Sequence, residues 1–435
     1  MILKNWWEKD LKDNVICPKL SKHIKTDYLV VGGGIAGLHA ALYLKNQGKK
    51  VVLLEKSYCG GSSSGKSSGF LTPSSELGLS EMINRYGLKD AKIVWEIPVL
   101  GVEEMANNVR KYKIDCDFEP QNCLFLGSKG SGEEKMKDEA LASKKMQVKY
   151  KYYDKKALGS ILNTNSYTAG VATYGTYSIN SRMYCKGLKK ILMKKHVRVF
   201  ENSEVLKISE STVHTLSGSV EAKKIIFCVD KPKPELNPDF ARKVYHAQTF
   251  LTISEKMTEK EIKSVFPKGK FMCWNSKLVY DYFKITKDDR LLLGGSSLLA
   301  FYSPNEFNSD VVVRSMIKRF KKQFPQLERL KFVAYWPGLI DIAKDIMPIV
   351  DFDRKNKNVQ YVLGNPGLPW AAFLGTYAAK RALGTDLKHL KKYERYIKAN
   401  RKFFISDQVQ RVIGKMPSFA VNNFYAQNYQ VDKEL

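Results

Sequence analysis

Three glycines in this chain have the spacing of a turn that holds a dinucleotide. Gly32, Gly34 and Gly37 form a G-x-G-x-x-G pattern, and Glu55 stands 18 positions beyond Gly37. Gly32 permits a tight turn, Gly34 lets a pyrophosphate approach the main chain, and Gly37 lets a helix pack closely on a strand. The pattern therefore predicts a binding site for a dinucleotide cofactor.

Glu55 adds a prediction about the ribose of that cofactor. A carboxylate at this distance accepts hydrogen bonds from ribose hydroxyl groups and repels a 2′-phosphate, which argues against NADP. A glycine-rich turn without a ligand is the simpler explanation of the glycines alone. At this point the residues leave FAD and NAD as alternatives.

The elements around the glycines supply the setting that such a turn needs. Residues 27–31 are an apolar run typical of a buried parallel strand. Apolar residues then recur at helical spacing up to Gly48, and residues 51–54 form a second apolar strand. In this order the free N–H groups at the start of the helix face the phosphates. The predicted contacts are Gly32, Gly33, Gly34, Ile35, Ala36, Gly37, Glu55 and Lys56.

A stretch rich in glycine and serine follows the second strand. Between residues 60 and 69, glycines allow the main chain to approach a ligand and serines offer hydroxyl groups. Lys66 supplies a point charge suited to pyrophosphate. A flexible linker has the same composition, so composition alone favours neither interpretation.

The charge of the chain is its unusual bulk property. The 435 residues carry a formal net charge of +28, which could indicate nucleic acid or an anionic membrane as a partner. The 72 basic residues comprise 14 arginines and 58 lysines, and the lysines are spread over the whole length. Specific phosphate recognition favours clustered arginine, so we interpret the lysines as a solvated surface.

The cysteines and the apolar stretches bear on the compartment. The seven cysteines are scattered, odd in number and without a C-x-x-C pair, which suits a reducing compartment and predicts no metal site. No stretch approaches the roughly 18 apolar residues that span a bilayer. The first residues lack an uninterrupted apolar core, so we expect no secretory signal and a cytoplasmic protein.

The remaining patterns predict two discontinuous domains. We expect a nucleotide-binding domain of residues 1–100, 170–235 and 335–400, and a substrate-binding domain of residues 101–169 and 236–334, with a C-terminal extension of residues 401–435. Thr258 is placed to cap a helix over residues 259–265. Residues 151–170 are expected to be a loop-rich connection, and an arm that carries Trp6 and Trp7 is expected to pack on the outside of the domain.

In this order the motifs resemble those of FAD-dependent oxidoreductases of the D-amino-acid oxidase, glycine oxidase and sarcosine oxidase superfamily. The resemblance is nearest to γ-glutamylputrescine oxidases and covers residues 5 to 400. It implies an α/β fold, with a Rossmann-type FAD-binding domain and a second α+β substrate domain built on a mainly antiparallel sheet. The matching segments are residues 64–69 for S-G-R-N-G-G, 281–284 for D-Y-x-R, 290–295 for R-x-x-x-G-G, 336–339 with Asp345 and Pro348, and 364–367 for G-x-x-G.

The resemblance selects FAD over NAD and extends the predicted site. Gly338 stands where sarcosine oxidases have the cysteine that holds flavin, so the FAD is expected to be non-covalent. Lys66 replaces an arginine, which keeps the charge but loses the bidentate geometry. The further cofactor contacts that it implies are Ser64, Gly65, Lys66, Ser67, Ser68, Gly69, Val205, Gly338, Gly364, Asn365, Pro366, Gly367 and Leu368.

The reaction implied by the resemblance is hydride transfer to flavin N5 from a carbon beside a neutral amine. The imine then hydrolyses, and oxygen or another acceptor reoxidises the flavin. Ile340 stands where glycine oxidases have a carboxylate-binding arginine, and an apolar residue cannot pair a carboxylate. This favours an amine over an α-amino acid. An amino-acid oxidase or dehydrogenase of the same superfamily remains an alternative, as does a basic nucleic-acid-binding protein.

Three side chains of the expected substrate domain alternate along one strand. Tyr280, Tyr282 and Lys284 therefore point to one face. We predict that the tyrosines wall the substrate and that Lys284 binds an anionic group or promotes oxygen reduction; an exposed sheet face is the alternative. The predicted catalytic residues are Lys284 and Tyr282, and the predicted substrate contacts are Tyr280, Tyr282, Ile340 and Trp370, with core packing as the alternative for Trp370.

Overall fold

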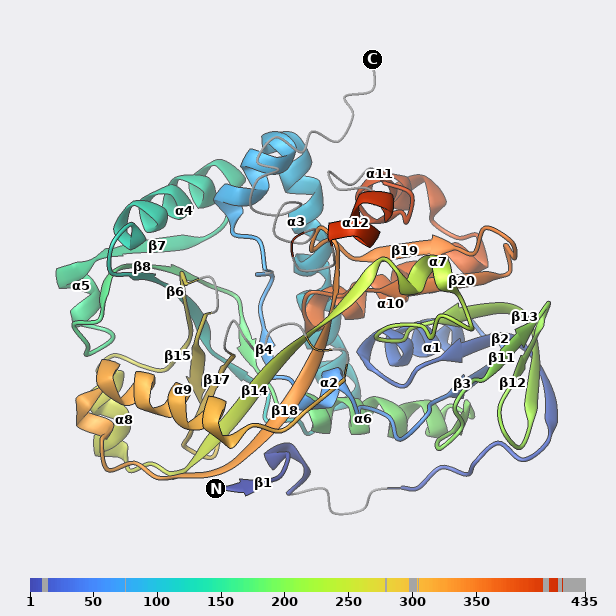
Figure 1. Ribbon diagram of the computed structural model, residues 1–435, viewed down its shortest axis with the longest axis horizontal. Helices are drawn as coiled ribbons and strands as arrows, with labels where there is room; N and C mark the ends of the chain where they lie inside the picture. Colours follow the sequence, from blue (N-terminus) through green and yellow to red (C-terminus); the bar gives the residue numbers. More distant parts are fainter. Residues whose placement is uncertain are drawn as a thin grey trace.

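The computed structural model contains two large sheets separated by long helices (Figure 1). It describes residues 1–9, 15–74, 76–277, 280–296, 303, 305–401, 407–413 and 417. One side of the molecule holds a nine-stranded sheet. The other side holds an eight-stranded sheet, which includes the strand that precedes the glycine turn. No helix among the described residues is long and apolar enough to cross a membrane.

The eight-stranded sheet is a parallel nucleotide-binding sheet with an antiparallel hairpin added. Its parallel order is β10-β3-β2-β13-β20, with β19 antiparallel to β20 and the hairpin β11–β12 beside β13. Strands β3 and β20 are buried along their whole length, as are the last three residues of β2 and of β13, because both faces of the sheet are covered there. The strands are β2 (His23–Val31), β3 (Val51–Leu54), β10 (Arg198–Phe200), β11 (Lys207–Ser209), β12 (Thr212–His214), β13 (Ser219–Phe227), β19 (Ile349–Phe352) and β20 (Val359–Leu363).

The nine-stranded sheet is mainly antiparallel. Its order is β1-β18-β14-β17-β16-β15-β6-β8-β7, and only the β1–β18 and β15–β6 pairs are parallel. One of its faces packs on α9 through a core that includes Phe283 and Phe320. The strands are β1 (Ile2–Leu3), β6 (Asn122–Ser128), β7 (Tyr150–Asp154), β8 (Tyr167–Thr173), β14 (Val244–Lys256), β15 (Phe271–Asn275), β16 (Tyr282–Ile285), β17 (Arg290–Gly295) and β18 (Phe332–Ala343).

The helices join the two sheets and cover them. Helix α3 lies in the middle of the view and bends at Gly87, which has φ +73°. Thr258 caps α8 as predicted, because its Oγ1 accepts a hydrogen bond from Glu261 N at 3.2 Å. The helices are α1 (Ile35–Asn46), α2 (Ser63–Lys66), α3 (Leu79–Tyr112), α4 (Gly132–Met146), α5 (Lys155–Gly159), α6 (Ser181–Lys194), α7 (Pro238–Ala241), α8 (Glu259–Val265), α9 (Asp310–Gln323), α10 (Leu368–Leu383), α11 (Leu387–Ile397) and α12 (Asp407–Ile413).

A third, small sheet lies close to the glycine- and serine-rich stretch. It has the order β4-β9-β5, with β4 at Phe70–Leu71, β9 at Tyr177–Ser178 and β5 at Glu119–Pro120. Both pairings are antiparallel. Strand β4, at the end of the glycine- and serine-rich stretch, therefore pairs with β9. Strand β9 also pairs with β5, which directly precedes β6 of the nine-stranded sheet.

The structure differs from the sequence expectation in three places. Residues 151–170 are not a loop-rich connection, because β7, α5 and β8 lie there and extend the nine-stranded sheet. The N-terminal arm does not pack on the outside: β1 pairs with β18, and Trp7 is buried. Strand β18 crosses the predicted boundary at residue 335, and β8 crosses the one at residue 170. With β1, three segments expected in the nucleotide-binding domain therefore belong to the nine-stranded sheet.

Candidate cofactor and substrate site

The glycine turn after β2 shows why two of its positions are glycine. Gly32 has φ +105°, and a Cβ there would lie 2.0 Å from the carbonyl oxygen of Cys228. A Cβ on Gly37 would lie 1.9 Å from the carbonyl oxygen of Gly32. Both clashes are with main chain, so glycine at these positions allows α1 to pack on the sheet.

Gly34 is glycine for a different reason. It precedes α1 in an extended conformation with φ −77°, which any residue can adopt. A Cβ there would have only the Ser64 side chain near it, with Oγ at 3.0 Å. Ile35 N donates to that Oγ at 3.0 Å, and the other N–H groups of the first turn have no helical partner. Gly34 therefore keeps the start of α1 open to an anion.

Glu55 follows β3 and lies beside this turn. Its Oε2 accepts a hydrogen bond from Gly33 N at 2.7 Å, and its Oε1 accepts one from Ser57 N at 2.8 Å. Burial raises the pKa of Glu55, whereas these two N–H groups and Lys56 act in the opposite direction. Each carboxylate oxygen accepts more than one hydrogen bond, so Glu55 can still bind ribose hydroxyl groups.

Val205 is one of the cofactor contacts that the resemblance implies. Its side chain is buried, and its main-chain N–H and C=O make no backbone hydrogen bond within the described residues. The segment before it is fixed, since Ser203 N donates to the carbonyl oxygen of Glu55 at 2.9 Å. A donor and an acceptor on the same residue match the edge of a base.

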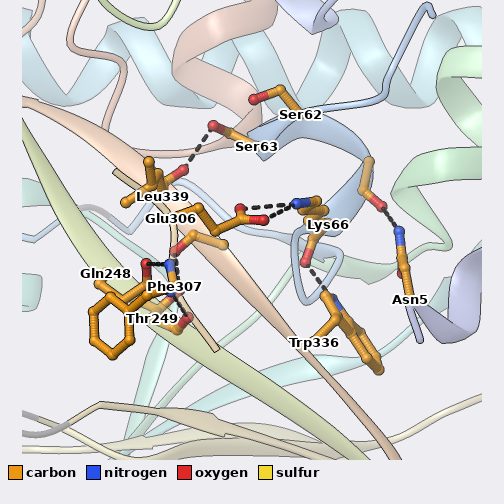
Figure 2. A network of polar contacts seen from close by, with 12 residues as sticks. Asn5, Ser62, Ser63, Lys66, Gln248, Thr249, Glu306, Phe307, Trp336 and Leu339 are labelled. Atoms are coloured by element: carbon orange, nitrogen blue, oxygen red, sulfur yellow. Dashed lines mark hydrogen bonds and ion pairs between the residues drawn. The ribbon is translucent and has the colours of Figure 1, made fainter. Parts of the chain in front are cut away.

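Residues 62–69 connect α1 to the nine-stranded sheet. Ser63 Oγ donates to the carbonyl oxygen of Leu339 in β18 at 2.7 Å (Figure 2). Trp336 Nε1, also from β18, donates to the carbonyl oxygen of Lys66 at 3.0 Å. Because Ser64 Oγ also accepts the hydrogen bond from Ile35 N of α1, the predicted cofactor loop is attached to both halves of the molecule.

The N-terminal arm holds the same loop from its other side. Asn5 Nδ2 donates to the carbonyl oxygen of Gly65 at 3.2 Å, and Trp7 Nε1 donates to that of Ser67 at 2.8 Å. The Trp7 ring also packs edge-on against Trp336, with ring centroids 6.1 Å apart. The sequence indicated the tryptophans of the arm, but nothing in their spacing indicated these partners.

Lys66 points its ammonium group at a carboxylate. Its Nζ lies 2.6 and 2.8 Å from the two carboxylate oxygens of Glu306, which precedes α9 (Figure 2). Its Cβ lies 3.9 Å from the position of a Cβ on Gly338. The structure therefore places Lys66 beside β18 and the segment before α9, and its contact with pyrophosphate stays a prediction.

The second predicted glycine segment begins α10. Gly367 is the N-cap of the helix, and Gly364 has φ +65°. Gly364 N donates to Asp341 Oδ2 in β18 at 2.5 Å, and burial raises the pKa of Asp341 well above its usual range. The buried Oδ1 of Asn365 has no hydrogen-bond partner among the described residues. A buried acceptor without a partner fits a segment that binds a further polar molecule.

Helix α10 also carries the predicted substrate contact Trp370. This side chain is fully buried in the core between the helices, as the alternative interpretation expected. Its Nε1 makes no hydrogen bond within the part of the chain that the structure describes. Its contact with substrate stays a prediction.

One face of the nine-stranded sheet is turned toward these segments. The strand register places Gly338 beside Thr249, and Gly294 beside Tyr282. The ring of Tyr282 lies over Gly294, within 2.2 Å of the position of a Cβ there. A Cβ on Gly338 would make ordinary van der Waals contacts, with Thr249 Oγ1 at 3.8 Å and Lys66 Cβ at 3.9 Å, so this position would admit one side-chain atom without a clash.

Lys284 lies on the same face and is almost entirely buried. Its Nζ donates to Ser178 Oγ at 2.7 Å and to the carbonyl oxygens of Gly69 and Ile179, each at 3.3 Å. Burial lowers the pKa of Lys284 to about 7, despite the opposing attraction of Glu119. Lys284 is therefore a buried amine that changes charge near neutral pH.

The three alternating side chains do lie together. The rings of Tyr280 and Tyr282 are 5.8 Å apart, and the ring of Phe70 in β4 is 5.9 Å from that of Tyr282. Lys284 Nζ is 5.7 Å from the Phe70 ring. Phe70 was absent from the predicted site, and its place directly after Gly69 is the signal that could have indicated it.

Comparison with known proteins decides the family. The sequence profile of the family DAO, described as FAD dependent oxidoreductase, matches residues 27–381. The chain belongs to this family. The match begins at the strand before the glycine turn and ends in α10, so it spans both glycine segments and the sheet face between them.

Individual relatives agree with this assignment. The chain is 28% identical over 361 residues to gamma-glutamylputrescine oxidoreductase of Escherichia coli, covering 80% of this chain and 81% of the relative. It is 27% identical over 384 residues to the probable oxidoreductase OrdL of Haemophilus influenzae, covering 85% of both. Glycine oxidase of Geobacillus kaustophilus has the same fold, with a TM-score of 0.72 at 15% identity over 83% of this chain and 95% of that one.

These findings confirm several sequence predictions. The chain is an FAD-dependent oxidoreductase of the DAO family, with the predicted α/β fold and FAD as its cofactor. The described residues fit FAD, because Gly34 leaves the start of α1 open and Asn365 keeps a buried acceptor without a partner. The assignment of each residue to a part of the cofactor remains a prediction.

Proposed function

We propose that this member of the DAO family oxidises the C–N bond of an amine, and that its substrate is similar to γ-glutamylputrescine. The observation that carries the proposal is the sheet face around Gly338. The side chains beside it on that face are Trp336, Ile340 and Thr249, and none of the three can pair a carboxylate of an α-amino acid. The similarity to gamma-glutamylputrescine oxidoreductase of Escherichia coli supports the same substrate class.

FAD, when bound, supplies the acceptor for the hydride that leaves the carbon beside the amine nitrogen. The chain contributes position and electrostatics. Residues 62–69 and the start of α10 approach the sheet face from the nucleotide-binding side, and the first turn of α10 directs N–H groups and the positive end of its dipole there. The ring of Tyr282 lies over Gly294 on the sheet face and limits the space for substrate there.

We assign Lys284 one of two roles. It promotes the reaction of the reduced flavin with oxygen, or it binds an anionic group of the substrate. With its pKa lowered to about 7 by burial, both charge forms are populated near neutral pH. The ammonium form stabilises negative charge on oxygen as it accepts an electron, whereas the neutral form does not. The oxygen reaction therefore requires protonated Lys284 in this proposal.

The same lysine favours a second candidate function within the family. A buried ammonium could pair a substrate carboxylate in place of the arginine that is replaced by Ile340. In that case the protein would be an amino-acid oxidase or dehydrogenase. The two functions make opposite predictions for the same experiment.

The test is anaerobic reduction of the FAD-loaded protein by a panel of amines and α-amino acids, followed by flavin absorbance. We expect γ-glutamylated and free diamines to bleach the flavin much faster than α-amino acids of similar length. Faster bleaching by an α-amino acid would select the second candidate. Bleaching by neither class would contradict both.

A further inference from the structure

A group of aromatic side chains extends the sheet face beyond Tyr282. The register places Phe125 of β6 beside Trp274 of β15, and Trp274 beside Tyr282 of β16. The Phe125 and Trp274 rings stack with centroids 5.8 Å apart. Phe70, from the end of the 62–69 loop, lies 6.5 Å from Trp274 and 5.9 Å from Tyr282. These four rings with Tyr280 are called the aromatic cluster below.

The aromatic cluster lies at the margin of packed cores, since Tyr282 packs against the buried cluster around Trp7 and Phe125 packs against the one around Met136. All five rings keep accessible surface and are only half-buried. By contrast, Phe283, which points to the opposite face of β16, is 1% exposed and packs against α9. Large rings that keep accessible surface at the margin of a core offer faces that a ligand can contact.

A carboxylate lies at the edge of the aromatic cluster. Tyr280 Oη donates to Glu76 Oε1 at 2.9 Å, and Tyr280 is in turn 5.8 Å from the ring of Tyr282. Glu76 is half-buried, and no ion pair with a lysine or arginine is recorded for it within the described residues. Burial raises the pKa of Glu76, and the hydrogen bond from Tyr280 acts in the opposite direction.

The chemistry of this arrangement selects a cation. Aromatic faces attract ammonium groups, and a half-buried carboxylate without a cationic partner is stabilised when such a group binds beside it. An anion is disfavoured by Glu76, and a neutral group would leave the carboxylate without an ion pair. Lys284, the buried cation of the site, bonds to Ser178 and to two carbonyl oxygens instead of Glu76.

We propose that Glu76 and the aromatic cluster form a subsite for a second ammonium group of the substrate, apart from the nitrogen whose C–N bond is oxidised. The substrate class is then a diamine or a diamine derivative that carries a further cationic group. This inference rests on the proposed function, because it assumes that the reacting group is an amine. It goes beyond that function by naming the residues that distinguish such a substrate from a simple monoamine.

The direct test uses a cation that cannot be oxidised. Tetramethylammonium, with tert-butanol as a neutral molecule of similar shape, is titrated into the FAD-loaded protein by calorimetry. We expect tetramethylammonium to bind and tert-butanol not to bind. Glu76→Gln should weaken tetramethylammonium binding by about tenfold or more, and Trp274→Leu should weaken it through loss of a ring. Glu103→Gln, an exposed carboxylate on α3, is the matched control and should leave the binding unchanged.

Each outcome decides the proposal. Tetramethylammonium that fails to bind, or that binds Glu76→Gln as tightly as the unchanged protein, would overturn the subsite. Flavin content of each variant equal to that of the unchanged protein shows that the variant is folded. If amines reduce the flavin but Glu76→Gln has no effect on binding, the subsite alone is wrong. If no amine reduces the flavin while tetramethylammonium binding depends on Glu76, the proposed function fails and the cation site stands.

Discussion

Lys284 shows how surroundings fix the chemistry of a single residue. Its ammonium group has three oxygen acceptors within 3.3 Å and lies 5.8 Å from the ring centroid of Trp7 and 5.7 Å from that of Phe70. Burial nonetheless outweighs these contacts and lowers its pKa to about 7. An exposed lysine would remain charged throughout the range in which most enzymes work.

The charge of Lys284 gives a pH prediction. Below pH 7 the side chain is protonated, and above it the cation is lost, so the rate of reaction between the reduced protein and oxygen should fall as the pH rises through about 7. Lys284→Met should lack this titration and react at least about tenfold more slowly at low pH. Stopped-flow mixing with oxygen measures both. Lys268→Met, which changes an exposed lysine, should retain the unchanged profile. Identical pH profiles for Lys284→Met and the unchanged protein would remove Lys284 from the reaction.

The glycines of the turn give a matched pair of predictions. A Cβ at Gly34 has only a serine side chain near it, whereas a Cβ at Gly37 would lie 1.9 Å from a carbonyl oxygen. Gly34→Val should therefore fold, as measured by thermal unfolding without FAD, yet retain less than about a tenth of the normal flavin because the pyrophosphate cannot approach. Gly37→Val should lower the free energy of unfolding by roughly several kcal/mol, because the new side chain clashes between helix and strand. Normal flavin content in Gly34→Val would contradict the assignment of this turn.

At the scale of elements, the arm and the 62–69 loop depend on contacts between residues far apart in the chain. Trp7, Trp336 and Asn5 all donate to main-chain oxygens of that loop. The start of α10 is held in the same way, through Asp341 of β18 and Gly364. These contacts position the predicted cofactor residues against the nine-stranded sheet.

A buried ion pair fixes the turn between β18 and β19. Arg401 Nε lies 2.6 Å from Asp345 Oδ2, its Nη2 lies 2.7 Å from Oδ1, and both side chains are almost fully buried. Arg401→Met should leave a buried carboxylate without its partner and lower the free energy of unfolding by about 3 to 5 kcal/mol. Chemical denaturation measures this loss. Arg354→Met, an exposed change in the following turn, should cost under about 0.5 kcal/mol, and an equal effect of the two variants would contradict the role of the pair.

The sequence predicted those elements whose signal is local. Residues 51–54 and 259–265 have the predicted bounds, because an apolar run marks the first and a capping threonine marks the second within a few positions. Strand β7 was missed because Lys151 and Asp154 interrupt its tyrosines, which leaves no apolar run, and its pairing with β8 makes it a strand.

The glycine positions of the turn could be predicted from the sequence, whereas the contacts between distant side chains could not. The glycine positions follow from backbone geometry that the pattern of residues encodes. Glu76, Asp341 and Glu306 could not be found in this way, because their partners lie far away in the sequence. The partner of a polar side chain is decided by the packing of elements, which no local pattern records.

At the scale of the whole molecule, we predict that no residue forms a covalent bond to the flavin. Gly338 has no side chain to form a bond, and the seven cysteines are all buried. Denaturation with acid should therefore release all of the flavin into the supernatant. Absorbance of the supernatant and of the washed precipitate measures the two fractions. Flavin that stays with the precipitated chain would contradict non-covalent binding.

The central claim is that two glycine segments, one at each end of the family match, close on a single FAD that lies against the nine-stranded sheet. A crystal structure of the FAD-loaded protein tests it most directly. We predict that the pyrophosphate lies within hydrogen-bond distance of the main chain at Gly34, and that the isoalloxazine ring lies between the start of α10 at Gly367 and the sheet face at Gly338. An isoalloxazine ring found away from both Gly367 and Gly338 would contradict the account.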